Sequence, residues 1–369
     1  MKVAIIGAGI VGSTAAYYLA KDPQVQVTVF DHGQGQATKA AAGIISPWFS
    51  KRRNKAWYRL ARLGADFYQE LIADLQADGQ ATDFYRQVGV YLLKKNEDKL
   101  PELHDLALSR KEESPLIGEL RLSSQEEVQE QFPGLQGFDQ LLYASGGARV
   151  EGALLTETLL AASQISLERK RVQLELTETG YRIEGQVFDQ VILATGAWLP
   201  AILEPLGYQV DIRPQKGQLR DYQLSVDTSD YPVVMPEGEL DIIPFLAGKL
   251  SMGATHENDQ GYDVTVDGEL LDTMQAEAET YYPALAEAQV LGARVGTRAY
   301  TSDFAPFWGQ IPQQEGLYVA SGLGSSGLTT GPLIGWHLAQ QVLGNPLQLD
   351  PADYPVERYM SQLMIESEK

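Results

Sequence analysis

The first 31 residues constrain the fold of this chain more than any other stretch. Lys2–Ile6 is a short apolar run of the kind found in buried parallel strands. It leads into Gly7–Gly12, a G-x-G-x-x-G turn, and then into Ser13–Lys21, whose small and apolar residues suit a helix packed on a sheet. Alternating valines over 25–29 predict a second strand that ends at Asp31. This order is typical of a βαβ dinucleotide-binding unit.

Each glycine of the turn has a separate physical use. Gly7 allows a tight turn, Gly9 lets a pyrophosphate approach the backbone, and Gly12 lets the helix lie close to the strand. The unpaired N–H groups of the helix N-terminus favour phosphate. Asp31 stands nineteen residues after Gly12, at the place of an acid that binds a ribose hydroxyl, and it favours FAD or NAD over NADP. A secretory signal is disfavoured, because the three glycines interrupt its apolar core.

The bulk composition excludes several classes of protein. The 369 residues suggest about two domains, and no apolar run is long enough to span a bilayer. With 29 Lys and Arg against 49 Asp and Glu, the net charge of −20 argues against nucleic acid and anionic membranes as partners. Without cysteine there is no disulfide, thiolate nucleophile or cysteine-bound metal, and the four scattered histidines do not form a zinc motif. We expect a cytoplasmic protein without a bound metal.

Two later apolar runs also end in turns of small residues. Val191–Ala194 leads into Thr195–Trp198, and Leu317–Ala320 leads into Ser321–Gly327. Such turns at the carboxyl ends of parallel strands are where open α/β sheets bind ligands. The last turn is expected to precede a helix over 333–343 that stops before a glycine.

The segments between these α/β signals are rich in short strands. Turn and strand patterns dominate 165–190 and 219–253, while helices are expected over 54–78, 151–163 and 268–281. No internal repeat or low-complexity linker separates them. The alternation predicts two domains whose chain segments interleave.

In this order and spacing, the motifs resemble the D-amino acid oxidase family of FAD-dependent oxidoreductases, especially its glycine oxidase and sarcosine oxidase branch. The matching pieces cover nearly the whole chain: Gly7–Gly12, Asp31, Ala41–Gly43, Ala194–Trp198, Pro214–Gln218, Gly253–Thr255, Glu257, Gly296–Arg298, Thr301, Asp303, Pro306, Gly309, Gly322–Gly327 and Pro332. The resemblance implies an α/β, Rossmann-like FAD-binding domain and an interleaved α+β substrate domain with a mostly antiparallel sheet. It assigns 1–85, 145–215 and 296–369 to the first domain and 86–144 and 216–295 to the second.

The resemblance also implies an activity. It implies oxidation of the C–N bond of a small amino acid or N-substituted amino acid to an imine, by hydride transfer to flavin N5, with O2 or another electron acceptor. FAD should be bound non-covalently, because attachment through cysteine is impossible here. Two alternatives remain open from the residues: an NAD-dependent Rossmann dehydrogenase, and an electron-transferring flavoprotein subunit that needs a partner chain. Oligomeric state is not predicted.

Site residues follow from the resemblance position by position. Arg298 corresponds to the arginine that clamps the substrate carboxylate, with Arg294 as a rival, and His256, Asp241 and Trp48 are further candidates for substrate contact. The positions expected to bind FAD are Gly7, Gly9, Ile10, Val11, Gly12, Asp31, His32, Ala41, Ala42, Gly43, Ile44, Val172, Thr195, Gly196, Trp198, Gly322, Gly324, Ser325, Ser326, Gly327, Leu328 and Thr329.

The chain departs from the branch at three positions. Members often carry tyrosine where this chain has Asp241, proline where it has Ala299, and histidine where it has Leu323. An acid near the substrate would alter charge complementarity. Plain glycine or sarcosine is therefore not the expected substrate.

Overall fold

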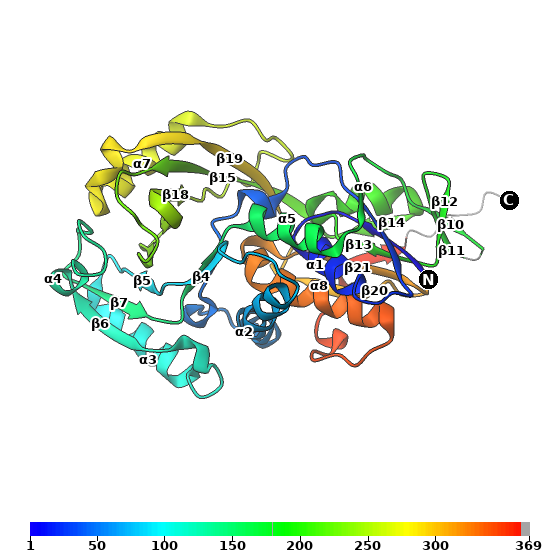
Figure 1. Cartoon of the computed structure of the whole chain (residues 1–369), viewed down its shortest axis with the longest axis horizontal. Helices are drawn as coiled ribbons and strands as arrows, with labels where there is room; N and C mark the ends of the chain where they lie inside the picture. Colours follow the sequence, from blue (N-terminus) through cyan, green and yellow to red (C-terminus); the bar gives the residue numbers. More distant parts are fainter. Residues whose placement is uncertain (179, 363–369) are drawn as a thin grey trace.

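The computed structural model describes residues 1–178 and 180–362. A six-stranded sheet lies at the centre of the half of the molecule that contains the N-terminus, at the right of Figure 1. In spatial order its strands are β20 (Phe307–Gln310), β21 (Leu317–Ser321), β13 (Gln190–Leu193), β1 (Lys2–Ile6), β2 (Gln26–Phe30) and β9 (Ser166–Glu168). All neighbours pair in parallel except β20, which is antiparallel to β21. The apolar runs near both ends of the chain form buried parallel strands, which confirms the prediction made from them.

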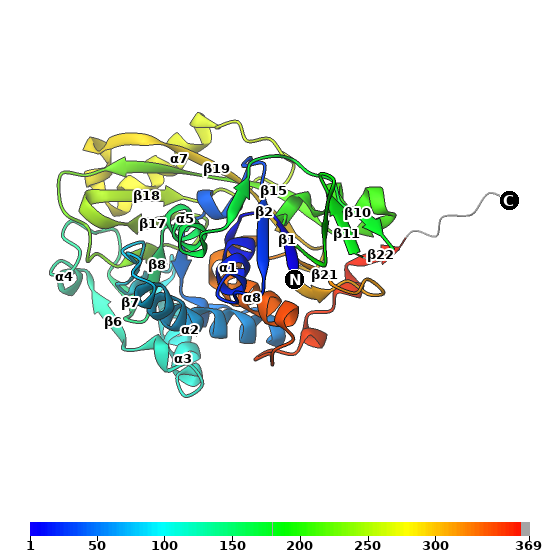
Figure 2. The same cartoon turned by 45° about the vertical axis from the view of Figure 1, so that its right-hand side comes forward.

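Four helices pack against one another beside this sheet: α1 (Ile10–Leu19), α2 (Lys55–Ala77), α5 (Gly152–Ser163) and α8 (Gly327–Leu343). α1 packs against α5 and α8, and α2 packs against α8 (Figure 2). The helices α1 and α8 approach closely at Gly335, where a Cβ atom would lie 2.4 Å from the carbonyl oxygen of Val11. Glycine in the middle of α8 therefore serves packing.

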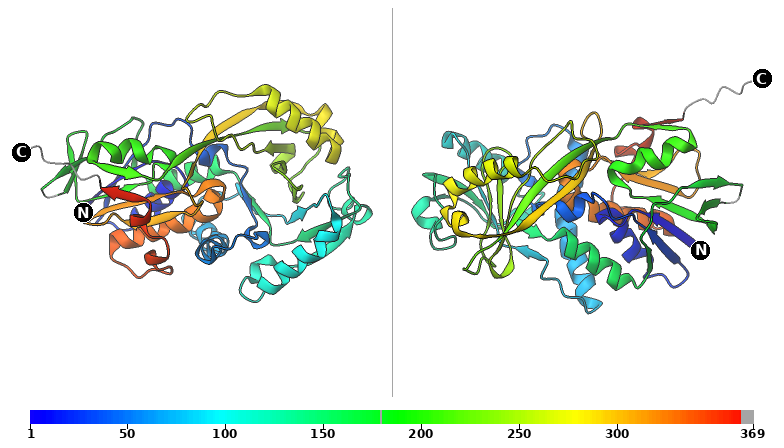
Figure 3. Two further views of the ribbon diagram at one scale, coloured as in Figure 1. Left: turned by 180° about the vertical axis from the view of Figure 1, so that it is seen from behind. Right: turned by 90° about the horizontal axis from the view of Figure 1, so that it is seen from above.

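An eight-stranded sheet occupies the other half of the molecule. Its spatial order is β19 (Gln289–Tyr300), β15 (Arg213–Gln223), β18 (Lys249–Gly253), β17 (Asp241–Pro244), β16 (Val233–Met235), β5 (Val90–Leu92), β7 (Gln140–Ala144) and β6 (Leu120–Ser124). Its neighbours pair antiparallel except β16 and β5. The helix α7 (Gly268–Tyr281) packs on β15 and β18, and α3 (Leu100–Arg110) packs on β6 and β7, at separate parts of the sheet (Figure 3).

Smaller elements complete the structure. They are the sheet of β3 (Ile44–Ile45), β8 (Ala148–Val150) and β4 (Tyr85–Gln87), the sheet of β10 (Glu175–Thr177), β11 (Gly180–Ile183) and β12 (Gln186–Phe188), the pair β14 (Tyr208–Val210) and β22 (Met360–Gln362), and the helices α4 (Gln125–Val128) and α6 (Leu199–Leu203). No helix among the described residues has the length and apolar character needed to cross a membrane.

The predicted fold class is confirmed, and the predicted helices over 54–78, 151–163 and 268–281 agree with α2, α5 and α7. The prediction for the last helix is wrong at its start, because α8 begins at Gly327 and contains Pro332. Proline removes the N–H that would bond the carbonyl oxygen of Leu328, four residues earlier. The hydroxyl of Tyr68 donates to that oxygen at 2.7 Å, so the helix continues.

The sequence pattern of residues 87–93 predicts one continuous strand, and this prediction is wrong, because the structure divides the segment in two. The extended conformation is interrupted at Gly89, whose φ of +86° suits glycine. As a result, β4 and β5 belong to different sheets. The eight-stranded sheet draws its strands from residues 90–144 and 213–300, and the six-stranded sheet draws them from the remaining segments. The exact domain boundaries stay a prediction.

Candidate active site

A single cavity of about 830 Å³ is lined by residues of both halves of the molecule. This volume lies within the range of about 300–1,000 Å³ found for small-molecule and cofactor sites. One end lies at the carboxyl ends of the parallel strands β1, β2, β13 and β21. The other end lies against β19, β17 and the turn between β16 and β17. We call these the cofactor end and the substrate end.

The glycine turn after β1 is shaped as the sequence predicts. A Cβ atom on Gly12 would lie 1.9 Å from the carbonyl oxygen of Gly7, so α1 packs directly on the turn. A Cβ atom on Gly9 would meet no atom closer than Thr38 Oγ1, at 3.4 Å, and Gly9 lines the cavity. The N-cap residue of α1 is Gly9, so no side chain caps the N-terminus of the helix. The turn therefore leaves open backbone and a helix N-terminus facing the cavity, which fits a pyrophosphate group.

Asp31 stands at the carboxyl end of β2 and lines the cavity. One carboxylate oxygen accepts the N–H of Ala8 at 2.6 Å, and the other accepts the N–H of Gly33 at 2.5 Å. These bonds fix the carboxylate beside the glycine turn. Carboxylate oxygens retain further acceptor capacity, which suits a ribose hydroxyl.

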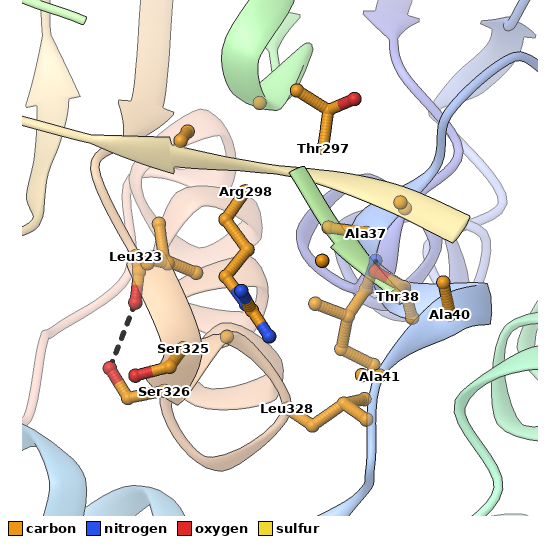
Figure 4. A pocket seen from close by; sticks show the side chains of 18 of the residues that line it. Ala37, Thr38, Ala40, Ala41, Thr297, Arg298, Leu323, Ser325, Ser326 and Leu328 are labelled. Carbon is orange, nitrogen blue, oxygen red and sulfur yellow. Dashed lines mark hydrogen bonds between the residues drawn. The ribbon is translucent and has the colours of Figure 1, made fainter. Parts of the chain in front are cut away.

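The middle of the cavity is bounded by the 3₁₀ turn Ala37–Ala40 and the start of α8. Thr38 Oγ1 accepts the N–H of Ile10 at 3.0 Å, which joins this turn to α1. The 3₁₀ turn Gly324–Ser326 runs into α8, which begins without a side-chain cap. Ser326 donates to the carbonyl oxygen of Leu323 at 2.9 Å (Figure 4). The N-terminal end of a 17-residue helix thus faces the cavity with a partial positive charge.

Arg298 extends from β19 into the cavity. Its guanidinium group points into the space between the start of α8 and the 3₁₀ turn that contains Thr38 (Figure 4). Nη1 donates to the carbonyl oxygen of Thr255 at 2.8 Å and to Gln215 Oε1 at 3.1 Å. No described carboxylate lies within ion-pair distance of Arg298, and burial lowers the pKa of its guanidinium. A positive charge held in place by neutral acceptors attracts an anion such as a carboxylate.

His256 and Asp241 line the same end of the cavity. His256 Nδ1 lies 3.4 Å from Glu239 Oε1, and burial followed by the charge of Arg298 lowers the pKa of its imidazole. Asp241 stands at the start of β17, and burial raises the pKa of its carboxyl from 3.8 to about 8. The substrate end therefore combines a fixed cation with an acid that is hard to ionise.

Most residues proposed from the sequence line the cavity. Besides Arg298, His256 and Asp241, these are Gly7, Gly9, Ile10, Val11, Asp31, His32, Ala41, Ala42, Gly43, Ile44, Val172, Thr195, Gly196, Trp198, Gly324, Ser325, Ser326, Gly327, Leu328 and Thr329. Gly12 and Gly322 do not line it; Gly12 acts in packing, and a Cβ atom on Gly322 would lie 2.9 Å from the carbonyl oxygen of Ala305. The individual roles stay predictions.

Trp48, a candidate for substrate contact, does not line the cavity. Its side chain is fully buried in the core, and the neighbours Pro47 and Phe49 line the cavity instead. Arg294, the rival for the clamp, does not line the cavity either. It donates to the two carboxylate oxygens of Asp221 at 2.8 and 2.9 Å. The geometry therefore favours Arg298 over Arg294 as the cation available to a ligand.

Sequence reasoning missed the turn between β16 and β17. Glu237, Gly238 and Glu239 line the cavity beside Asp241, and Lys94 faces the same space. Two acids around a glycine between short apolar strands are a hairpin signal. That signal could have located the turn, but nothing local indicates that it faces a ligand.

A parallel sheet with a dinucleotide-binding turn is joined to an antiparallel sheet, and a partly buried arginine faces the cavity that they share, as expected of an enzyme with a dinucleotide cofactor and a separate substrate sheet. The family described as FAD dependent oxidoreductase (DAO) matches residues 2–341. The chain belongs to this family, the D-amino acid oxidase family, and it is an enzyme that uses FAD.

Relatives and solved structures agree with this assignment. An uncharacterized oxidoreductase of Bacillus subtilis (strain 168), YurR, is 40% identical over 95% of this chain and 97% of its own. A glycine oxidase of Pseudomonas aeruginosa is 30% identical over 96% and 98%. The crystal structure of iminodiacetate oxidase (IdaA) from Chelativorans sp. BNC1 is 35% identical, with a TM-score of 0.88 over 98% of this chain and 99% of that one. The comparisons support neither the NAD-dependent nor the electron-transferring alternative.

Proposed function

We propose that this enzyme oxidises the C–N bond of a small amino acid or N-substituted amino acid to an imine, passing the electrons to O2 or another acceptor. The observation that carries the proposal is Arg298, whose guanidinium faces the cavity shared by the two sheets and pairs with no carboxylate among the residues that the structure describes. A carboxylate is the anion that matches its planar fork. The glycine oxidase and iminodiacetate oxidase relatives are named for substrates that carry an amine next to a carboxylate.

The chain's own contribution is orientation. When bound, FAD supplies the acceptor for the hydride that leaves the carbon beside the nitrogen. Arg298 holds the carboxylate, which fixes that carbon relative to the cofactor end of the cavity. The N-terminus of α8 places a partial positive charge beside the same space and favours negative charge there. No Ser-His-Asp or paired-carboxylate arrangement is needed for this chemistry.

A substrate screen under anaerobic conditions tests the proposal. The purified protein should be yellow, and acid precipitation should release all its flavin into the supernatant. Amino acids and N-alkylglycines should then be added in turn, and bleaching of the flavin absorbance should identify the substrates. Bleaching by amines that lack a carboxylate, with none by any amino acid, would overturn the amino-acid assignment.

Aerobic turnover distinguishes an oxidase or dehydrogenase from an electron-transferring subunit that needs a partner chain. An enzyme that passes electrons to O2 or to a small dye should turn over as the isolated chain. If it is reduced by substrate but is reoxidised only after a partner protein is added, it is an electron-transferring subunit.

A further inference from the structure

Asp241 lines the substrate end of the cavity, and the proposed function gives its carboxylate no role. Three carboxylates line this wall, those of Glu237, Glu239 and Asp241. Glu237 accepts the N–H of Lys95 at 3.1 Å and lies 3.8 Å from Lys94 Nζ. Glu239 pairs with His256. Among the described residues, only Asp241 of the three has neither a hydrogen-bond donor nor a cation beside its side chain.

The register of the sheet separates Asp241 from Arg298. Asp241 pairs with Gly253, Gly253 pairs with Leu219, and Leu219 pairs with Arg294, so one row crosses β17, β18, β15 and β19. Three strand spacings of about 4.8 Å place the backbones of β17 and β19 about 14 Å apart. Arg298 lies four residues further along β19, on the same face as Arg294.

Electrostatics agree with this separation. Burial lowers the pKa of Arg298, and the groups whose charges raise it are Tyr300, Glu239 and Glu257, whereas burial alone accounts for the raised pKa of Asp241. The amine nitrogen and the carboxylate carbon of an α-amino acid are only about 2.5 Å apart. A substrate whose carboxylate is held by Arg298 therefore presents a more distant part of itself to Asp241.

We propose that the substrate carries a second, cationic group, joined by a spacer to the amine that is oxidised, and that Asp241 is the residue that selects for it. This inference rests on the proposed function, because it takes Arg298 as the carboxylate clamp. A carboxylate with no partner inside a cavity is costly to ionise, and an ammonium group brought by the substrate removes that cost. The substrate class is then a basic amino acid, or a glycine whose nitrogen bears an aminoalkyl chain.

The charges around Asp241 do not supply this cation. His256 loses its proton more easily because of burial and Arg298, so it is neutral at pH 7. Lys94 faces Glu237, and Arg294 is paired with Asp221. Within residues 1–178 and 180–362, each of the other cations near this wall therefore has a partner of its own or is the proposed clamp.

A matched set of achiral substrates provides the test. N-(ω-aminoalkyl)glycines, with chains from ethyl to pentyl, are compared with N-alkylglycines that end in methyl and with N-(ω-carboxyalkyl)glycines of equal length. The holoenzyme should favour the ammonium series over the methyl series in kcat/KM by about ten- to hundred-fold at the best length. In Asp241→Asn this preference should largely disappear. The control Asp83→Asn removes the same charge from an exposed residue outside the cavity and should keep the preference.

The pH dependence provides a second readout. Because burial places the pKa of Asp241 at about 8, its carboxylate forms as pH rises from 7 to 9, while an alkylammonium stays charged up to about pH 10. The ammonium-to-methyl ratio of kcat/KM should therefore rise through pH 8 in the native enzyme and stay flat in Asp241→Asn. Equal rates for the ammonium and methyl series, or a preference for the carboxylate series, would overturn this inference alone. If none of the three series bleaches the flavin but another amino acid does, this inference fails alone, and if no amino acid of any kind bleaches it, the proposed function fails as well.

Discussion

The two ends of the cavity are lined by different kinds of residue. The cofactor end consists of glycines, alanines and backbone N–H groups at the ends of β1, β2 and β21, with Asp31 as its one predicted acid. The substrate end adds to its apolar lining a group of charged side chains, which reach the cavity from β17, β19 and neighbouring loops. The first end binds through the shape of the backbone, whereas the second binds through the charges of individual side chains.

This difference has consequences for mutation. At the cofactor end a change should act through sterics, so that an added methyl group harms both folding and FAD binding. At the substrate end a change should act through charge, with FAD content preserved. The following predictions test that separation, from the largest expected effect to the smallest.

Removal of the proposed clamp should have the largest effect. Arg298→Ala should lower kcat/KM by roughly a thousand-fold, about 4 kcal/mol, because the substrate carboxylate then enters a desolvated cavity without a partner. Arg298→Lys should recover only part of this loss, since a lysine lacks the planar fork. FAD content should stay normal in both variants. Steady-state kinetics and flavin absorbance measure the two quantities.

Arg294→Ala is the control for that experiment. Because Arg294 pairs with Asp221 and does not line the cavity, its loss should lower the melting temperature and leave kcat/KM of the folded enzyme nearly unchanged. If Arg294→Ala cripples turnover and Arg298→Ala does not, the clamp has been assigned to the wrong arginine.

Gly12→Ala should be a strongly harmful change at the cofactor end. Its Cβ atom would lie 1.9 Å from a backbone oxygen, which cannot move aside without displacing the glycine turn. Overpacking of this kind costs about 3 kcal/mol. Thermal unfolding should show the destabilisation and the purified protein should lose FAD. Gly268→Ala, where a Cβ atom meets nothing within 4 Å, should change neither quantity.

Asp31→Ala should weaken FAD binding by roughly ten- to hundred-fold, since a hydrogen bond to a charged group contributes about 1.5–3 kcal/mol. The change also removes the acceptor of the N–H groups of Ala8 and Gly33, so Asp31→Asn, which restores one acceptor, should lose less. Fluorescence titration of the apoprotein with FAD measures the affinity. An unchanged dissociation constant for Asp31→Ala would show that Asp31 is not the ribose acid.

Asp241 should affect neither FAD binding nor the glycine turn, and its effect should appear in stability as a function of pH. Its folded-state pKa of about 8 lies above the ordinary value of 3.8, so the folded state binds the proton more tightly than the unfolded state between these values. Stability should therefore fall as pH rises from 4 to 8. Asp241→Asn removes this contribution and should raise the melting temperature by a few degrees at pH 8–9 and by little near pH 4. A variant that is no more stable at pH 9 would show that Asp241 is ionised at little cost.

The cofactor end could be predicted from sequence because its determinants are local. The strand, glycine turn, helix and acid of residues 2–31 lie within one continuous segment, and short-range sterics leave few other ways to fold it. The error at α8 arose where a distant residue intervened. Pro332 indicates a helix boundary locally, but Tyr68 of α2 supplies the hydrogen bond that the proline cannot preserve.

Only the tertiary structure decided which side chains face the substrate end of the cavity. The sequence pointed to Arg298 only through the resemblance of its surrounding motif. It could not separate Arg298, which faces a cavity and has neutral partners, from Arg294, which pairs with an acid 73 residues away. Trp48 was misplaced for the same reason, because an aromatic residue can face either a core or a cavity and only packing settles which. The row that joins β17 to β19 separates Asp241 from Arg298, and sheet register depends on pairings between strands distant in the chain.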